Sequence, residues 1–237
     1  MQYSFQPIGI IHSCFKDKFG VPRQPGLVKG ARGELELLPP YDRPEAVVGL
    51  EVFSHLWLSF VFHHCLDDEV RLSVRPPRLG GNKKLGVFAT RSTHRPNPIG
   101  LSVVALEGIR HDQGHTRLLL SGLDLIEGTP VLDIKPYLPY VDVVADARAG
   151  YAQAPPVASL RLIFTAQTEQ QCLRHEQQWP GLAELIESVL TLDPRPAYKR
   201  NDNPGRIFGI RLYDLDVRWR VLEEGVIEVV ELCPVSQ

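Results

Sequence analysis

Short apolar runs separated by glycine and proline dominate the first 145 residues. The runs are rich in Val, Ile, Leu and Phe, which favours strands, and no long helical pattern lies between them. A parallel sheet with helical crossovers is therefore not expected. Closing an antiparallel sheet into a barrel removes the exposed edges of so many short strands. The expected strands are 4–12, 33–38, 55–63, 85–90, 99–110, 116–122 and 129–135, with one or two helical turns at 44–52.

The pattern changes after residue 145. Residues 145–158 are small and proline-rich, which predicts a linker or surface arm. A strand is expected at 160–166, a helix at 167–179, and two or three strands over 206–233 with a turn at Glu224 and Gly225. A second helix is predicted after Pro180 by apolar residues at helical spacing, namely Leu182, Leu185, Ile186, Val189 and Leu190. The prediction is a mainly β protein, with an N-terminal antiparallel β-barrel domain (1–145) and a small C-terminal α+β domain (146–237).

Composition narrows the class of protein. The 237 residues are 43% hydrophobic and 23% charged, as in ordinary globular proteins. A net charge of −2 excludes a general basic coat, so any nucleic-acid contact must be a local patch. The cysteines are dispersed, which indicates reduced thiols rather than a disulfide framework or zinc site. The longest apolar run, 56–62, is too short to span a bilayer, and the N-terminus lacks a signal-peptide pattern. A cytoplasmic protein without membrane contact is expected.

Positive charge is concentrated in residues 75–101, which contain no acidic residue. This stretch also holds four prolines and four glycines, and Pro96 and Pro98 restrict Arg95 and Asn97 to extended backbone. A shaped, positively charged loop suggests a site for a polyanion or nucleotide. The competing interpretation is a solvated basic surface with ordinary turns. The cations are Arg75, Arg78, Lys83, Lys84, Arg91 and Arg95.

Familiar nucleotide and metal motifs are absent. The piece GGNKKLG (80–86) is followed by Val87 and Phe88 where a phosphate loop needs Lys and Ser or Thr, and no G-x-G-x-x-G follows a strand. His63 and His64 end an expected strand, so their side chains should point to opposite faces and not share a metal. One of them is expected either to face a ligand pocket or to cap the strand edge.

Two further segments carry candidate chemistry. Residues 123–140 contain Asp124, Glu127, Asp133, Lys135 and Tyr137, whose acidic and phenolic groups suit proton transfer or ribose binding. A plain ion pair between Asp133 and Lys135 is the alternative. Near the C-terminus, basic and aromatic residues gather in a pattern that suits RNA, with Trp219 expected in the core. These residues are Arg195, Tyr198, Lys199, Arg218 and Arg220.

Five motifs in order resemble the TrmO proteins, bacterial tRNA methyltransferases of the TsaA-like family, also called YaeB. They are VPRQPGLV (21–28), RPPRLGGN (75–82), GVFATRSTHRPNPIGLS (86–102), LDLIEGTPVLDIKPYLP (123–139) and DPRPAY (193–198), and the resemblance covers nearly the full chain. It implies methylation, by S-adenosylmethionine, of the exocyclic N6 amine of threonylcarbamoyladenosine at tRNA position 37. It also implies an all-β methyltransferase barrel, a homodimer and no metal.

The resemblance also implies a methyl-donor site. The acceptor amine of the modified adenosine in addition calls for a group that can remove its proton. The donor site should include Pro22, Arg23, Gln24, His63, His64, Arg91, Leu101, Leu123, Asp124, Leu125 and Ile126. The acceptor amine is a poor nucleophile, so removal of its proton would help, and Asp124, Asp133 and Tyr137 are the candidate bases. Arg75, Arg78, Arg95 and Lys135 are candidates for the threonyl carboxylate. Two other classes stay open: a non-catalytic RNA-binding β-barrel module, and an enzyme acting on a small phosphorylated metabolite.

Overall fold

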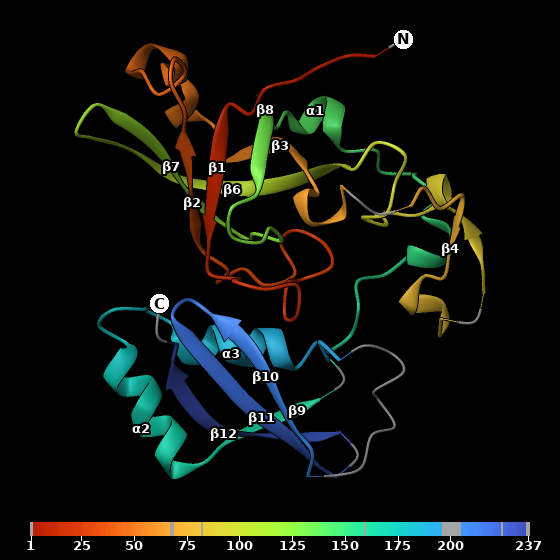
Figure 1. Ribbon diagram of the computed structural model, residues 1–237, viewed down its shortest axis with the longest axis vertical. Coiled ribbons are helices and arrows are strands. Elements are labelled where there is room, and N and C mark those ends of the chain that lie inside the picture. Colours follow the sequence, from red (N-terminus) through yellow and green to blue (C-terminus); the bar gives the residue numbers. More distant parts are fainter. Residues whose placement is uncertain are drawn as a thin grey trace.

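An antiparallel six-stranded barrel forms the N-terminal part of the computed structural model (Figure 1). The structure describes residues 2–66, 69–81, 83–158, 160–195, 205–223 and 225–235, so Tyr198, Lys199 and Glu224 lie outside the described residues. The barrel closes in the order β1-β2-β7-β6-β3-β8, which confirms the mainly β fold. Its strands are β1 (Gly9–Ser13), β2 (Gly33–Leu37), β3 (His55–Val61), β6 (Ile99–Asp112), β7 (His115–Ser121) and β8 (Pro130–Pro136).

Side chains alternate between the barrel interior and its outer surface. On β3, Leu56, Leu58 and Phe60 are buried, whereas Trp57 and Ser59 are only partly covered. This period of two is what a closed sheet with one apolar face requires. Each fully buried side chain of this size contributes about 1.5–3 kcal/mol to stability. The interior is therefore a packed core, and a ligand site must lie at a barrel end or on the outer surface.

Three connections emerge at the same end of the barrel because successive strands alternate in direction. They are residues 14–32, the connection between β3 and β6, and residues 122–129. The third crosses this end: the N–H groups of Leu123, Glu127 and Gly128 donate to the carbonyls of Ala31, Phe15 and Ile11. At the other end lie the short helices η1 (Pro44–Val47) and η2 (Leu50–Val52), in agreement with the one or two turns expected there.

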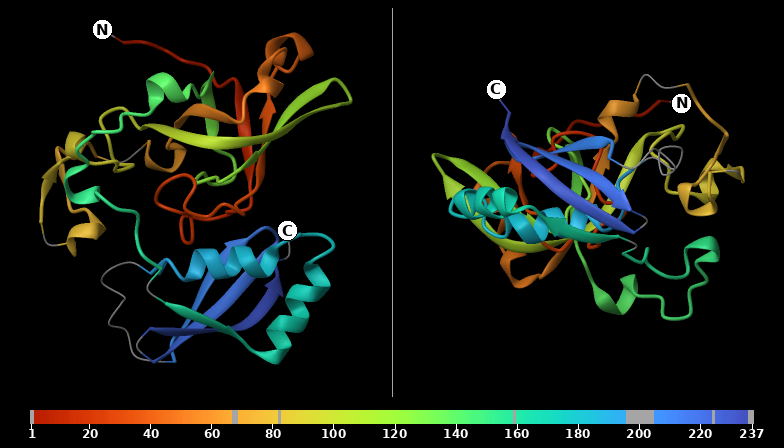
Figure 2. Two further views of the ribbon diagram at one scale, coloured as in Figure 1. Left: turned by 180° about the vertical axis from the view of Figure 1, so that it is seen from behind. Right: turned by 90° about the horizontal axis from the view of Figure 1, so that it is seen from below.

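An arm projects from the barrel between β3 and β6 (Figure 2). We call residues 69–81 and 83–98 the basic arm. It is built on the small hairpin of β4 (Ser73–Val74) and β5 (Leu85–Gly86), with η4 (Pro77–Leu79) between them and η5 (Val87–Ala89) after them. The expected strand 85–90 is therefore wrong beyond Gly86. The Thr90 N–H donates to the Val87 carbonyl, and this bond winds the chain into a helical turn.

A four-stranded sheet and two helices form the C-terminal part, as expected for an α+β unit. The sheet order is β10-β11-β12-β9, with β9 parallel to β12, and Trp219 of β11 is buried as predicted. Among the described residues, no helix is long and apolar enough to cross a membrane. The elements are β9 (Arg161–Phe164), α2 (Ala166–His175), α3 (Leu182–Leu190), β10 (Ile207–Leu212), β11 (Leu215–Glu223) and β12 (Val226–Pro234).

The C-terminal sheet contacts the barrel end that carries the three connections (Figure 1). Phe15 forms a β-bridge with Leu212, and the Tyr213 N–H donates to the Cys14 carbonyl over 2.7 Å. Phe15, Cys14 and Leu212 are fully buried, so this junction is part of the core. The segment between the two sheets holds α1 (Pro139–Asp142) and η6 (Gly150–Ala152) and is tied to the basic arm by the Arg78 guanidinium, which donates to the Ala154 carbonyl. The predicted domain division at residue 145 stays a prediction.

The packing around Gly100, at this barrel end, leaves no room for a side chain. An added Cβ would lie 2.2 Å from the Phe60 ring, which is itself buried. The strand therefore needs glycine at this position because the Phe60 ring covers it. We expect Gly100→Ala to lower the free energy of unfolding by about 1–3 kcal/mol, because the buried ring must move. Urea unfolding measures this loss. Gly30→Ala, where nothing lies within 4 Å of an added Cβ, is the control. Equal losses in both variants would contradict the packing argument.

Candidate functional site

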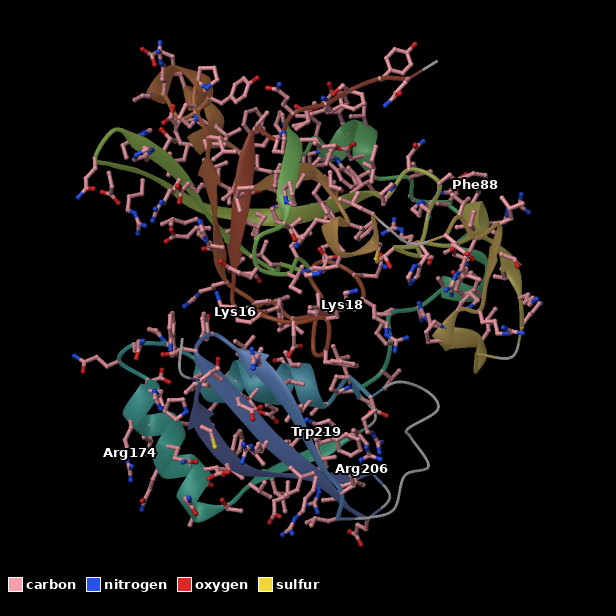
Figure 3. All side chains as sticks on the ribbon, in the orientation of Figure 1. Lys16, Lys18, Phe88, Arg174, Arg206 and Trp219 are labelled. Atoms are coloured by element: carbon pink, nitrogen blue, oxygen red, sulfur yellow. The ribbon has the colours of Figure 1, made fainter. Side chains whose placement is uncertain are left out.

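The segments predicted to bind the methyl donor are joined at the barrel end beneath β3 and β6. The Arg91 guanidinium donates to the Gln24 side-chain carbonyl, which links the basic arm to the 14–32 connection. The Gly26 N–H donates to the Gly122 carbonyl over 2.9 Å, and the Lys18 ammonium donates to the His64 carbonyl over 3.2 Å. Figure 3 shows Lys16 and Lys18 on this connection, on the side that faces the C-terminal sheet. All three connections therefore contribute to one region.

Asp124 is the chemically most informative group in this region. Its Oδ1 accepts a hydrogen bond of 2.7 Å from the hydroxyl of Ser102, a buried residue of β6. Burial raises the pKa of Asp124 to about 6, and the Ser102 hydrogen bond and the positive charge of Arg91 oppose part of that rise. A carboxyl group with this pKa changes protonation state near neutrality, which suits a proton acceptor.

The two histidines do not lie as the sequence suggested. β3 ends at Val61 and His63–Cys65 forms the 3-10 helix η3, because the Cys65 N–H donates to the Phe62 carbonyl. The expectation of opposite faces is therefore wrong: the two ring centroids are 4.2 Å apart. Burial lowers the pKa of His63, and the neighbouring His64 lowers it further. In the part of the chain that the structure describes, no cluster of three metal-binding side chains is found.

The other predicted donor-site residues include both buried and exposed side chains. Leu123 and Leu125 are buried in the core, so only their backbone groups can meet a ligand. Pro22 is also buried, whereas Arg23 is exposed and Ile126 is partly exposed. Leu101 presents an apolar side chain that is 55% exposed. The region thus offers backbone polar groups, one apolar surface and two charges of opposite sign.

The other two candidate bases have surroundings different from those of Asp124. Tyr137 donates its N–H to the carbonyl of His55, the first residue of β3, whereas His63 follows the last. The seven residues of β3 separate these positions by about 20 Å at a rise of about 3.3 Å per residue. Asp133 lies opposite Ser59 and its carboxylate contacts the Lys135 ammonium. The ion-pair alternative for Asp133 and Lys135 therefore agrees with the structure. Ser59 pairs with Asp133 on one side and with Leu101 on the other, so Asp133 is separated from Leu101 by one strand and differs from Asp124 in its ion pair rather than in distance from the donor-site residues.

Cations of the basic arm have different surroundings. Arg95 donates to the Thr90 carbonyl over 2.7 Å and so stabilises its own loop. Arg75 lines a hollow of about 380 Å³ together with Arg71 and Lys84. Sequence reasoning missed Arg71 and Ser102. Arg71 precedes the stretch without acidic residues, while Ser102 ends the 86–102 motif and carried no chemical signal until β6 placed it beside Asp124.

The C-terminal cations do not form the free patch that was predicted. Arg195 is only 7% exposed, and its guanidinium binds both carboxylate oxygens of Asp193. The prediction that Arg195 contacts tRNA does not fit this buried position. Arg218 forms ion pairs with Asp216 and Glu231, and Arg220 with Glu228. The charge of these two arginines is therefore partly neutralised within the sheet.

Comparison with known proteins identifies the family. The model of the tRNA-methyltransferase O N-terminal domain matches residues 10–143, and that of the TrmO C-terminal domain matches residues 157–235. The chain belongs to the TrmO family. It is 52% identical to the tRNA (adenine(37)-N6)-methyltransferase of Escherichia coli strain K12, over 94% of this chain and 95% of that protein.

Further TrmO relatives agree in sequence and in structure. A Pseudomonas aeruginosa protein named "Putative S-adenosylmethionine-dependent methyltransferase RcsF" is 56% identical over 98% of each chain. A crystal structure of TrmO from Pseudomonas aeruginosa superposes with a TM-score of 0.83 and 49% identity, covering 98% of this chain and 99% of that one. The similarity therefore includes both sheets.

Asp124 should leave a measurable trace in the pH dependence of stability. Its pKa is higher in the folded protein (about 6) than its ordinary value of 3.8, so the folded state binds the proton more tightly. The contribution of Asp124 to the free energy of unfolding is therefore greatest below about pH 4, and it is lost as the pH rises to about 6. We expect Asp124→Asn to remove about 2–3 kcal/mol of that fall.

Urea unfolding between pH 4 and pH 7 measures the effect, with Asp133→Asn as the matched control because Asp133 is half exposed. The fall in stability should remain in the control. An unchanged fall in Asp124→Asn would show that this carboxyl group titrates normally.

Proposed function

We propose that this chain transfers a methyl group from S-adenosylmethionine to N6 of adenine 37 in tRNA, and that this adenine carries a threonylcarbamoyl group. The observation that carries the proposal is 52% identity, over 94% of the chain, to a tRNA (adenine(37)-N6)-methyltransferase. The partly buried Asp124, whose pKa is influenced by the charge of Arg91, supplies the matching chemistry. A non-catalytic RNA-binding module would not need a buried carboxyl group there, and the curated relatives give no support to an enzyme acting on a small phosphorylated metabolite.

The barrel end offers groups that suit the donor. S-adenosylmethionine supplies an electrophilic methyl group on a cationic sulfonium and also carries a carboxylate. Arg91 offers positive charge, Asp124 negative charge, and Leu101 an exposed apolar side chain. We assign donor binding to these residues together with the backbone of residues 123–126, Gln24 and His63. The fixed connections lower the entropy lost on binding and orientation.

Asp124 is the proposed proton acceptor for the N6 amine. The lone pair of this nitrogen is delocalised into the purine and the carbamoyl group, so loss of its proton must accompany attack. With a pKa of about 6, Asp124 is mainly ionised at neutral pH and can accept that proton. The Ser102 hydroxyl holds the carboxylate in place. Asp133 and Tyr137 take no part in this proposal.

Both parts of the chain have a place in the proposal. We assign donor binding to a domain of residues 1–145 and additional tRNA contact to residues 146–237. The β-bridge between Phe15 and Leu212 holds the C-terminal sheet against the donor-binding end, so both parts can contact one tRNA. Arg75 and Arg78 of the basic arm are exposed and able to meet RNA. Arg195 is omitted because it is buried.

The functional form of the protein is proposed to be a homodimer of two copies of this chain. Large apolar side chains are exposed on the basic arm and at the start of β6, and Figure 3 shows Phe88 at the outer side of the arm. Exposed patches of this kind mark protein interfaces. The residues are Val70, Leu72, Phe88 and Ile99.

We expect light scattering to give the mass of a dimer, because a partner would bury these side chains. The double variant Leu72→Ser, Phe88→Ser should shift the mass toward the monomer. Val157→Ser, an equally exposed apolar residue of the linker, should leave the dimer intact. A monomeric wild-type protein at micromolar concentration would refute this part of the proposal.

Mass spectrometry of tRNA nucleosides tests the activity. In a strain that lacks the gene, N6-methylated threonylcarbamoyladenosine should disappear, and the wild-type gene should restore it. Purified Asp124→Asn should methylate tRNA about 10²–10⁴-fold more slowly, because the proton acceptor is lost. Asp133→Asn should keep nearly wild-type activity. Persistence of the methylated nucleoside in the deletion strain would contradict the proposed function, and full activity of Asp124→Asn would contradict the role of this residue.

A further inference from the structure

The basic arm carries a half-open hollow with a positively charged lining. Its volume is about 380 Å³, which falls within the usual range of ligand pockets, about 300–1,000 Å³. None of its described lining residues is a carboxylate, and its three permanent cations form no ion pair with a carboxylate of the described residues. We call this hollow the arm pocket; its polar lining is Arg71, Ser73, Arg75, Lys84, Ser92 and His94.

The walls of the arm pocket are held by defined hydrogen bonds. Ser73 and Val74 pair with Gly86 and Leu85 in the β4–β5 hairpin, and the Val87 N–H donates to the Leu72 carbonyl over 3.0 Å. Pro77 starts the short helix η4, which ends at Gly80 in left-handed backbone. A solvated basic surface needs none of this order. The fixed backbone instead keeps like charges close together, an arrangement that an anion would stabilise.

One wall of the arm pocket also belongs to the proposed donor site. Ser92 and His94 line the pocket, while the preceding Arg91 reaches Gln24 and lies close enough to influence the pKa of Asp124. The Thr90 hydroxyl accepts the Ser92 N–H, and the Ser92 hydroxyl accepts the His94 N–H. The loop therefore presents its side chains to two sites from one short, internally bonded segment.

We propose that the arm pocket binds an oxyanion of the tRNA substrate close to the methylated base. The inference rests on the proposed function and adds a recognition site to it. Arginine and lysine donors, together with two serine hydroxyls, suit a tetrahedral phosphate or a planar carboxylate. Such an oxyanion comes either from the RNA backbone or from the threonylcarbamoyl group on the base, and both sources share this chemistry.

Neighbouring lysines provide a matched test. Lys84 lines the arm pocket, whereas the equally exposed Lys83 does not. We expect Lys84→Ala and Arg75→Ala to raise the Kd for tRNA about 10- to 100-fold, as for loss of a charge-assisted contact. Lys83→Ala should change it less than about threefold, as expected for a surface charge without a specific contact. Ser73→Asp, which places a carboxylate in the pocket, should weaken binding at least as much as Lys84→Ala. Unchanged thermal unfolding midpoints show that the variants are folded.

Two RNAs distinguish the sources of the oxyanion. Filter binding with an unmodified transcript and with tRNA from the deletion strain, which keeps its other modifications, gives Kd values over a range of salt concentrations. Equal losses on both RNAs, with a salt slope reduced by about one per lost contact, indicate a backbone phosphate. Losses confined to the modified tRNA indicate the base-borne carboxylate.

If Lys84→Ala and Arg75→Ala bind both RNAs as tightly as Lys83→Ala does, the inference is overturned. Failure of the proposed function would be visible separately, as wild-type protein that binds tRNA but does not methylate it.

Discussion

Closure of six antiparallel strands is the constraint on which the other features depend. Because successive strands run in opposite directions, the connections 14–32 and 122–129 and the basic arm all start from the same barrel end. The 122–129 segment is then held across that end by backbone hydrogen bonds to Ile11, Phe15 and Ala31. In an open sheet these segments would be spread along the row of strand ends. The closed barrel concentrates them around one small region.

Burial gives that region its chemistry. Asp124 lies between two core residues, Leu123 and Leu125, and its own side chain is partly buried and bonded to the buried Ser102. The same burial that makes the ionised form costly raises its pKa to about 6. Ser102 and Arg91 offset only part of that cost. Asp133, by contrast, is half exposed and forms an ion pair with Lys135.

The basic arm and the C-terminal sheet extend the region in different ways. The arm holds its cations on a bonded hairpin without local acidic partners among the described lining residues, so they remain available to an anion. In the C-terminal sheet, Arg218 and Arg220 are instead paired with neighbouring carboxylates. Its contribution near the barrel is structural, through the buried contact of Phe15 with Leu212. Electrostatic attraction of RNA is therefore expected mainly from the arm.

The sequence by itself determined the mainly β class of fold, because short apolar runs with no long helical pattern between them favour strands. It also indicated the basic arm, because six cations with no acid and many prolines and glycines form a strong local signal. The tertiary structure alone decided which residues meet. Asp124 and Ser102 are 22 residues apart and join through the barrel interior, whereas Tyr137 shares a motif with Asp124 yet lies at the other end of β8. Arg195 shows the same limit: sequence spacing suggested an exposed cation, but Asp193 holds it in the interior. Local pattern reports which faces are apolar, while long-range pairing and burial fix the neighbours and the charge state of each group.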